Sequence, residues 1–448
     1  MKASDLLVKC LEAEGVEYIF GIPGEENLDF LDSLARSKIK FIVTRNEQSA
    51  VFMAATYGRF TGKPGVTLST LGPSATNLIT GVGYAQLNGL PVVLITGQKP
   101  IKSSKQGDFQ IIDVVAMMEP VTKSAAQIKN ASKIPSLVRQ AFKVAVSERP
   151  GAVHLELPED IAEEEVADLQ PILQSKIRRP QVEDKAIDLL IQELESAKCP
   201  IILIGAGANR KRVTKYLQLF IEKYNIPFFE SQMGKGVVDE RLDQYLGTAA
   251  LSSKDYVHLA IEQADLILAI GHDTIEKPTH LLESGKTKTI HLNYYLAKTD
   301  ETYSPFMEVI GDLGNLFWQL VELRKIDSSS WNFDLVYKLA TEGKDKSIKN
   351  LAKEENSVVM MPRRFVKEVS EYMEKNDILA LDNGWYKIWI ARNYIASHPN
   401  AVLLDNTFAT MGGGLPIATM AKFLNPDKKV LAIVGDGGLV MNLGDLET

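Results

Sequence analysis

Four consecutive residues, Gly435, Asp436, Gly437 and Gly438, have the types and the order of a diphosphate and metal site. They follow the apolar run 430–434, which is expected to form a strand. Glycines after a strand let backbone amides approach a diphosphate, and a buried aspartate among them would bind a hard cation such as Mg²⁺. Similar triplets also occur in ordinary turns, so the motif needs support from the rest of the chain.

A second candidate for phosphate binding is the segment GAGANR at 205–210. It follows an apolar strand and precedes a basic helix, so a phosphate could rest on the N-terminus of that helix. The segment lacks the third glycine and the later acidic residue of the full dinucleotide-binding fingerprint. A tight strand-to-helix turn is therefore the alternative interpretation.

Composition and charge narrow the classes of ligand and the location. The chain has 50 Lys and Arg against 57 Asp and Glu, a net charge of -7, which offers no basic footprint for nucleic acid but allows a small metabolite. The N-terminus lacks the apolar core of a signal peptide, and no run approaches the roughly 18 apolar residues of a membrane span. Cys10 and Cys199 form no metal-ligand or redox motif. A cytoplasmic protein that does not associate with membranes is expected.

The elements that would position these residues follow an α/β pattern. Short apolar strands alternate with helices over residues 1–165, which predicts a parallel sheet with ligands at the carboxyl ends of its strands. A charged linker at 162–185 leads to a second such unit at 186–325, and a polar stretch at 327–356 leads to a third at 355–448. The fold class expected is α/β with three doubly wound parallel-sheet domains.

Several segments, taken together, resemble the thiamine-diphosphate-dependent enzymes, and most closely the acetolactate synthases. They are EYIFGIPGEEN, RNEQSAVFMAATYGRFTGKPGV, STLGPSATNLITGVGYAQLNGLPVVLITGQ, RPGAVHLELPEDI, DNGWYKIWIAR, ATMGGGLPIA and GDGG. The resemblance extends from about Lys2 to Thr448. It implies thiamine diphosphate and Mg²⁺ as cofactors and 2-keto acids as substrates.

The resemblance assigns Glu47 to the carboxylate that drives the cofactor's aminopyrimidine into its reactive imino tautomer. A carboxyl group in a largely apolar pocket can share its proton with a ring nitrogen, as this role requires. Met411 matches the bulky residue that props the cofactor in its bent shape, and the backbone of Ala409 and Met411 would bond the pyrimidine edge. The other implied cofactor contacts are Pro23, Gly24, Gly72, Pro73, Gly384, Trp385, Tyr386, Gly435, Asp436, Gly437 and Gly438, with Asp436 as the metal ligand. Trp385 and Tyr386 are bulkier than is usual at their positions.

The segment QGDFQIIDVVAMMEPVTKSA is similar to the substrate-side loop of the flavin-independent, catabolic acetolactate synthases. It would let Gln110 donate to the substrate carbonyl and Lys123 pair with the substrate carboxylate. Flavin-containing biosynthetic relatives have an arginine-phenylalanine-aspartate run after LILAIG, whereas this chain has HDTIEKP. This departure disfavours FAD, which stays an alternative because 205–210 could hold an adenine nucleotide.

The implied reaction joins two 2-keto acids, for example two pyruvates to 2-acetolactate and CO₂, in a catabolic pathway or in branched-chain amino acid biosynthesis. In the family the first domain of one subunit faces the third domain of another. A dimer or tetramer with its sites between subunits is therefore expected, with Glu47 and Asp436 of one site on different chains.

Two alternatives to this function are open. The first is another thiamine-dependent 2-keto acid decarboxylase or carboligase, but decarboxylases often carry adjacent histidines in the first domain, and the first histidine here is His154. The second is an inactive scaffold. Only twelve residues follow Asp436, and a family asparagine that completes the magnesium sphere would lie beyond them. The third domain is therefore expected to be truncated and the chain by itself inactive.

Overall fold

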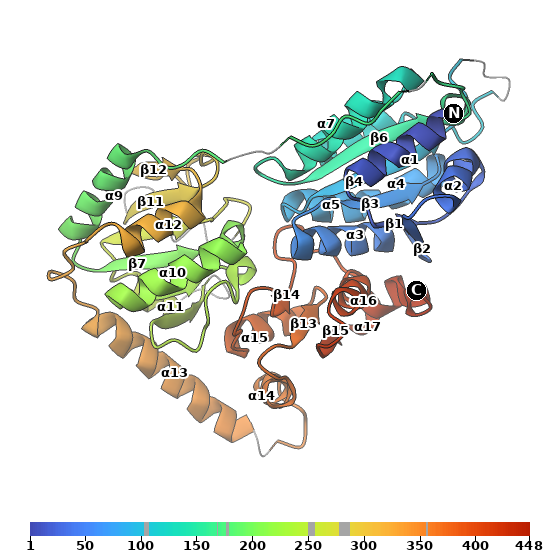
Figure 1. Cartoon of the computed structure of the whole chain (residues 1–448). Helices are drawn as coiled ribbons and strands as arrows, with labels where there is room; N and C mark the ends of the chain where they lie inside the picture. The colour runs from blue at the N-terminus through green and yellow to red at the C-terminus, as the bar shows by residue number, and fades with distance from the viewer. Residues whose placement is uncertain (103–106, 168, 176–178, 250–255, 277–286, 355–356) are drawn as a thin grey trace. The chain divides into compact units, whose positions relative to one another are not determined.

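The computed structural model describes residues 1–102, 107–167, 169–175, 179–249, 256–276, 287–354 and 357–448. These form two compact units. One comprises Met1–Ile177, Thr407–Asp427 and Ala432–Thr448, and the other comprises Arg178–Asn406 and Lys428–Leu431. Three sheets of six, six and three strands lie among helices, which confirms the predicted α/β class with parallel sheets (Figure 1).

The first sheet has the strand order β2-β1-β3-β4-β6-β5, and every neighbouring pair is parallel. Its central strands β3, β4 and β6 are buried along their whole length, as expected for apolar strands covered on both faces. The strands are β1 (Tyr18–Gly21), β2 (Lys40–Val43), β3 (Gly65–Ser69), β4 (Val92–Gln98), β5 (Ser124–Gln127) and β6 (Ala152–Pro158).

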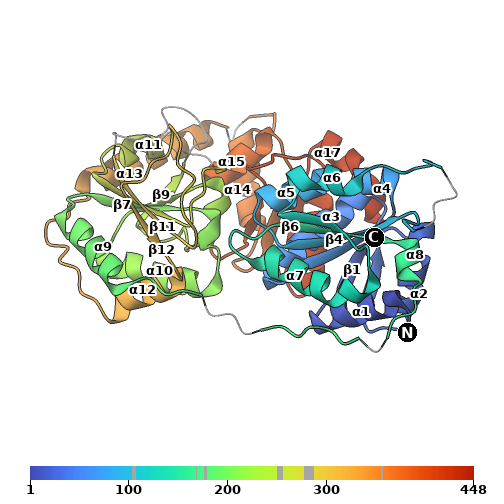
Figure 2. The same ribbon diagram turned by 90° about the horizontal axis from the view of Figure 1, so that it is seen from above.

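Helices cover both faces of this sheet (Figures 1 and 2). On one face α1 (Ala3–Ala13), α2 (Leu28–Ala35) and α7 (Ile134–Val146) enclose an apolar core. On the other, α3 (Glu47–Thr61) packs on α5 (Ile79–Leu87) and on the central strands. The sequence predicts one helix at 76–89, whereas the structure has α4 (Gly72–Asn77) and then α5, because a proline near the start of α4 favours an earlier beginning. Two further short helices are α6 (Val114–Met118) and α8 (Glu159–Ala162).

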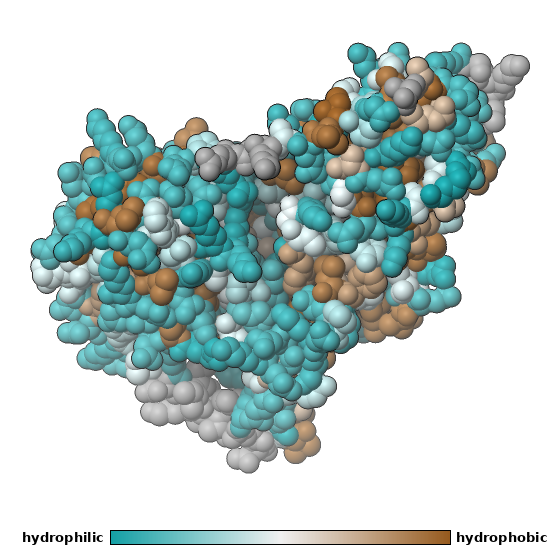
Figure 3. Space-filling view, viewed as in Figure 1, coloured by the Kyte–Doolittle hydropathy of each residue, from teal (hydrophilic) through white to brown (hydrophobic). Residues whose placement is uncertain are grey.

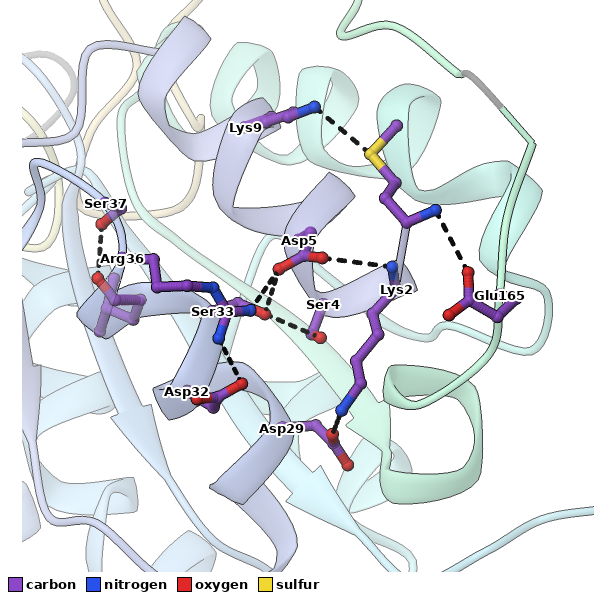
Figure 4. A network of polar contacts seen from close by, with 12 residues as sticks. Lys2, Ser4, Asp5, Lys9, Asp29, Asp32, Ser33, Arg36, Ser37 and Glu165 are labelled. Carbon is purple, nitrogen blue, oxygen red and sulfur yellow. Dashed lines mark hydrogen bonds and ion pairs between the residues drawn. The ribbon is translucent and has the colours of Figure 1, made fainter.

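A polar network fixes α2 against α1 (Figure 4). The Lys2 ammonium group pairs with Asp29 at 2.6 Å, and both the Ser33 hydroxyl and the Arg36 guanidinium donate to Asp5 Oδ1 at 2.8 Å. The exposed ion pairs contribute little to stability because solvent screens them. The Ser33 hydroxyl bond adds direction, so the network orients α2, which begins just after the turn at 22–27.

The second sheet has the order β12-β11-β10-β7-β8-β9 and is also parallel throughout. Alternate residues of β7 face opposite cores: Ile202 and Ile204 pack with α9, α10 and α12, whereas Ile201 and Leu203 pack with α11 and α13. The strands are β7 (Pro200–Ile204), β8 (Phe228–Glu230), β9 (Tyr245–Thr248), β10 (Leu266–Ile270), β11 (Lys288–Asn293) and β12 (Met307–Ile310). The helices are α9 (Asp184–Ser196), α10 (Lys211–Tyr224), α11 (Tyr256–Ile261), α12 (Leu313–Glu322) and α13 (Asp334–Glu354).

The third sheet is small, with the order β14-β13-β15. The strands expected there are present as β13 (Ile378–Leu381), β14 (Val402–Leu403) and β15 (Val430–Ile433). The accompanying helices are α14 (Pro362–Tyr372), α15 (Trp385–Asn393), α16 (Gly414–Leu424) and α17 (Asp436–Met441). The polar stretch at 327–356, predicted only as a separator, contains the long helix α13.

Hydrophilic side chains cover most of the face seen in Figure 3, and apolar groups are scattered among them. Within the described residues, no helix is both long enough and apolar enough to span a bilayer.

Candidate active site

Glu47 is the first residue of α3, at the carboxyl end of β2. The helix begins here because the Asn46 side chain caps it, accepting a 2.9 Å bond from the backbone N–H of Gln48. The Glu47 side chain is buried, with only 8% of its surface exposed. Its Oε1 accepts from the Ser74 hydroxyl at 2.7 Å and its Oε2 accepts from the Asn77 amide at 3.0 Å.

Both donors come from α4, where their spacing of three residues places them on one helix face. Hydrogen bonds to charged groups are worth about 1.5–3 kcal/mol each. Ser74 and Asn77 therefore fix the plane of the Glu47 carboxylate. Sequence reasoning missed them, although their helical spacing directly after Gly72 and Pro73 was a usable signal.

The other residues assigned to the first domain's cofactor contacts lie in the turns after β1 and β3, at the same edge of the sheet as Glu47. A side chain on Gly24 would meet Thr70 at 2.1 Å, so the turn holding Pro23 and Gly24 packs directly on the end of β3. Gly72 has a φ of +47°, and a Cβ on it would lie 2.7 Å from the carbonyl oxygen of Gln110. The structure thus brings Pro23, Gly24, Gly72, Pro73 and Gln110 to the edge where Glu47 lies.

Lys123 lies elsewhere. It directly precedes β5, at the amino edge of a parallel sheet, whereas Glu47 lies at the carboxyl edge. Its ammonium group donates to the carbonyl oxygens of Val144, Ser147 and Arg149 at 2.6–2.7 Å, at the C-terminus of α7. Burial lowers the pKa of Lys123 to about 8. The structure therefore does not bring Lys123 to Glu47, contrary to its predicted place beside the substrate.

The segment 407–413 belongs to the same compact unit as Glu47. Ala409 has a φ of 57°, a strained conformation that is enriched at ligand sites, and Gly412 has a φ of 88°. Met411 is 42% exposed, and a Cβ on Gly437 would lie 3.4 Å from its Cε atom. The structure therefore places the predicted propping residue beside the predicted diphosphate turn.

Hydrogen bonds link the start of α3 to this part of the chain, in part through the Asn442 amide. Gln48 Nε2 donates to Asn442 Oδ1 at 3.3 Å, and Asn442 Nδ2 donates to the carbonyl oxygen of Gly412 at 2.6 Å. The backbone N–H of Arg45 donates to Asp445 Oδ1 at 2.9 Å. Within one chain, the helix that carries Glu47 thus lies against the segments that carry Met411 and Asp436.

The expected burial of Asp436 is wrong. Asp436 begins α17 and is exposed, and its Oδ1 accepts from the backbone N–H of Gly437 at 2.8 Å. The turn is open because β15, which it follows, is a half-buried edge strand. No three His, Cys, Asp or Glu side chains gather into a metal group in the described residues. A Mg²⁺ at Asp436 would complete its oxygen shell from backbone or amide groups and from the diphosphate.

Gly384, Trp385 and Tyr386 belong to the other compact unit, so the structure does not group them with Glu47 or Met411. Gly384 precedes the first residue of α15, and a Cβ on it would lie 2.6 Å from the Tyr386 ring. Trp385 is 80% exposed.

These features fit thiamine diphosphate. Glu47 offers a buried carboxylate held by two donors, and Ala409 supplies a strained backbone. A Cβ built on Gly437 would meet only the Cε atom of Met411 within 4 Å, apart from the neighbouring residues of its own helix. The turn is therefore open to a diphosphate.

Comparisons with known proteins agree with this geometry. Three family profiles match the chain: "Thiamine pyrophosphate enzyme, N-terminal TPP binding domain" at residues 1–117, the central domain at 187–320, and the "C-terminal TPP binding domain" at 382–448. The chain therefore belongs to the thiamine pyrophosphate enzyme family.

Similar proteins within the family carry the name acetolactate synthase. A probable acetolactate synthase large subunit of Methanocaldococcus jannaschii is 33% identical over 100% of this chain and 78% of its own length. The acetolactate synthase of Bacillus subtilis is 31% identical over 100% of this chain and 79% of its own. A catabolic acetolactate synthase of Raoultella terrigena is 32% identical over 99% of this chain and 80% of its own length.

Proposed function

We propose that the protein is a flavin-independent acetolactate synthase, which condenses two 2-keto acids such as pyruvate with loss of CO₂. The observation that carries the proposal is the buried Glu47 carboxylate, held by Ser74 and Asn77 at the start of α3. The names of relatives about 30% identical support the same activity.

Each residue has a distinct role in this proposal. Thiamine diphosphate, when bound, supplies the nucleophilic carbon and accepts the electrons released by decarboxylation. Glu47 holds and returns the proton at the pyrimidine ring, and Ser74 and Asn77 keep its carboxylate oriented. Met411 would pack against the bound cofactor beside Gly437. Asp436 and the adjoining glycines hold Mg²⁺ and the diphosphate, and Gln110 donates to the substrate carbonyl.

We further propose that the active protein is a dimer or a tetramer. The contacts that join α3 to Gly412 and Asn442 within one chain can be made with the same local geometry between two copies. Such an exchange would place Glu47 of one subunit beside Asp436 of another in each of two symmetric sites.

The test is an acetolactate assay with pyruvate, thiamine diphosphate and Mg²⁺, with and without FAD. Acetolactate is expected at the same rate in both conditions. Acetaldehyde as the main product would favour a decarboxylase instead, and the absence of any thiamine-dependent turnover by the full-length protein would overturn the proposal.

The matched variants are Glu47→Gln and Glu163→Gln. Glu47→Gln keeps the size of the side chain but not its proton chemistry, so activity should be abolished while the circular dichroism spectrum is unchanged. Glu163, exposed after α8, is the control and should leave turnover intact. Full activity in Glu47→Gln would refute the assignment of the catalytic carboxylate.

A further inference from the structure

The second sheet has the topology that binds nucleotides in many α/β proteins. From β7 the chain proceeds to β8 and β9 on one side, and β10, β11 and β12 are added on the other. The switch point therefore lies between the carboxyl ends of β7 and β10, where ligands bind in open α/β sheets. The segment 205–210, with its predicted phosphate turn, follows β7 at this point.

A protein carboxylate already occupies the turn. The backbone N–H of Ala206 donates to both Oε atoms of Glu276, at 3.0 and 3.2 Å, and the Ser231 hydroxyl also donates to Oε2. Glu276 is only 2% exposed. A carboxylate matches a phosphate in the sign of its charge and in accepting charge-assisted hydrogen bonds. Glu276 thus takes the contacts that a nucleotide phosphate would need.

The remaining backbone donors of the turn are also used by the protein. The N–H groups of Gly205 and Gly207 donate to the carbonyl oxygens of Ile270 and Gly271 at 2.9 and 2.8 Å. Those of Ala208, Asn209 and Arg210 donate within the turn, to Gly205, Ala206 and Ala208. With Ala206 bound to Glu276, each backbone N–H of 205–210 has a protein acceptor. None is left to line a phosphate cradle.

The glycines of the turn are also explained without a ligand. A Cβ on Gly205 would lie 2.6 Å from the carbonyl oxygen of Gly271, and one on Gly207 would lie 2.8 Å from the same atom. Both glycines therefore permit close packing of the turn on the end of β10. Arg210, the cation of the motif, stacks its guanidinium 3.8 Å from the centroid of the Tyr294 ring.

We propose that Glu276 is a built-in anion that fills the phosphate position of the central domain, so that this domain takes up no FAD or other nucleotide through 205–210. The inference concerns the second sheet and holds whatever reaction the first and third perform. It also favours the tight-turn interpretation of GAGANR over phosphate binding.

The experiment compares the wild-type protein with Glu276→Ala, Glu276→Gln and the exposed control Glu262→Ala. FAD binding is followed by flavin fluorescence, and binding of ADP and inorganic phosphate by calorimetry. Wild type and control are expected to bind none of them. Glu276→Ala uncovers the donors of Ala206 and Ser231, so it should bind phosphate or ADP with an affinity at least tenfold above the detection limit at which wild type shows none.

Stoichiometric FAD or ADP on the wild-type chain would overturn the proposal. So would a folded Glu276→Ala protein that gains no affinity for anions, because the carboxylate would then not be holding an anion position. If Glu276→Ala does not fold, the near-isosteric Glu276→Gln decides: added phosphate should raise its melting temperature but not that of wild type, and equal responses would contradict the inference.

Discussion

The Ser74 hydroxyl donates a 2.7 Å hydrogen bond to Oε1 of Glu47, across 27 residues of sequence. The bond joins the start of α3 to α4, the two helices that follow β2 and β3 at the carboxyl edge of the first sheet. Ser74 holds one oxygen of the Glu47 carboxylate, and Asn77 holds the other. Together the two donors set the angle at which the carboxylate would meet the pyrimidine ring of the cofactor. Ser74 is thus a positioning residue whose loss should affect turnover more than substrate affinity.

Ser74→Ala should lower kcat by roughly ten- to a hundredfold, because a hydrogen bond to a charged group is worth about 1.5–3 kcal/mol. The KM for pyruvate should change little. Thr76→Ala is the matched control, since the Thr76 hydroxyl lies on the same helix but donates to the carbonyl oxygen of Pro73. Ser74→Thr keeps a hydroxyl and should recover most of the activity. A Ser74→Ala enzyme with wild-type kcat would remove Ser74 from the site.

Lys123→Met should destabilise the protein rather than weaken substrate binding. The ammonium group of Lys123 satisfies carbonyl oxygens at the end of α7, and losing these charge-assisted bonds should cost about 2 kcal/mol. The measurement is the free energy of unfolding in urea together with the KM for pyruvate. Lys133→Met, at an exposed position before α7, should change neither. A large rise in KM at unchanged stability would instead restore the substrate role predicted from sequence.

The sequence was sufficient to predict the parallel sheets, but not to predict which residues lie at the edges of each sheet. Apolar strands such as β4 and β7 are predictable because burial on both faces demands continuous hydrophobicity. Strand β5 reads Ser-Ala-Ala-Gln and lacks that signal, so Lys123 could not be assigned to the amino edge. The Ser74–Glu47 and Ala206–Glu276 bonds join residues 27 and 70 apart, which no local pattern encodes. The exposure of Asp436 depends on β15 lying at the edge of its sheet.

Mixing two inactive variants tests where the site is assembled. Glu47→Gln and Asp436→Asn should each be inactive alone. If the sites lie between subunits, mixed dimers contain one site with both changes and one with neither, so activity should return to about a quarter of wild type after random re-association. The control is a mixture of Glu47→Gln with itself, carried through the same dissociation. No recovery in verified mixed dimers would mean that each chain supplies both residues of its own site.

Glu230→Gln should change how stability depends on pH. Glu230 is fully buried, and its Oε1 lies 3.8 Å from the Lys235 ammonium group, which makes its closer contact, 2.7 Å, with Glu240. One lysine cannot neutralise both carboxylates. Burial, and then the charge of Glu240, raise the pKa of Glu230 well above its ordinary value of 4.5.

The sign of the effect follows from proton uptake. Above pH 4.5 the unfolded chain loses the Glu230 proton while the folded protein keeps it, so the folded state binds more protons and stability falls as pH rises toward the folded pKa. Glutamine resembles the protonated acid and cannot ionise, so the Glu230→Gln protein should not lose this stability as pH rises. Urea unfolding should be measured from mildly acidic to neutral pH. The free energy of unfolding of Glu230→Gln should increase relative to that of wild type as pH rises, whereas the exposed control Glu262→Gln should follow wild type. Parallel curves for wild type and Glu230→Gln would show that the carboxyl group is already ionised in the fold, with Lys235 compensating both glutamates.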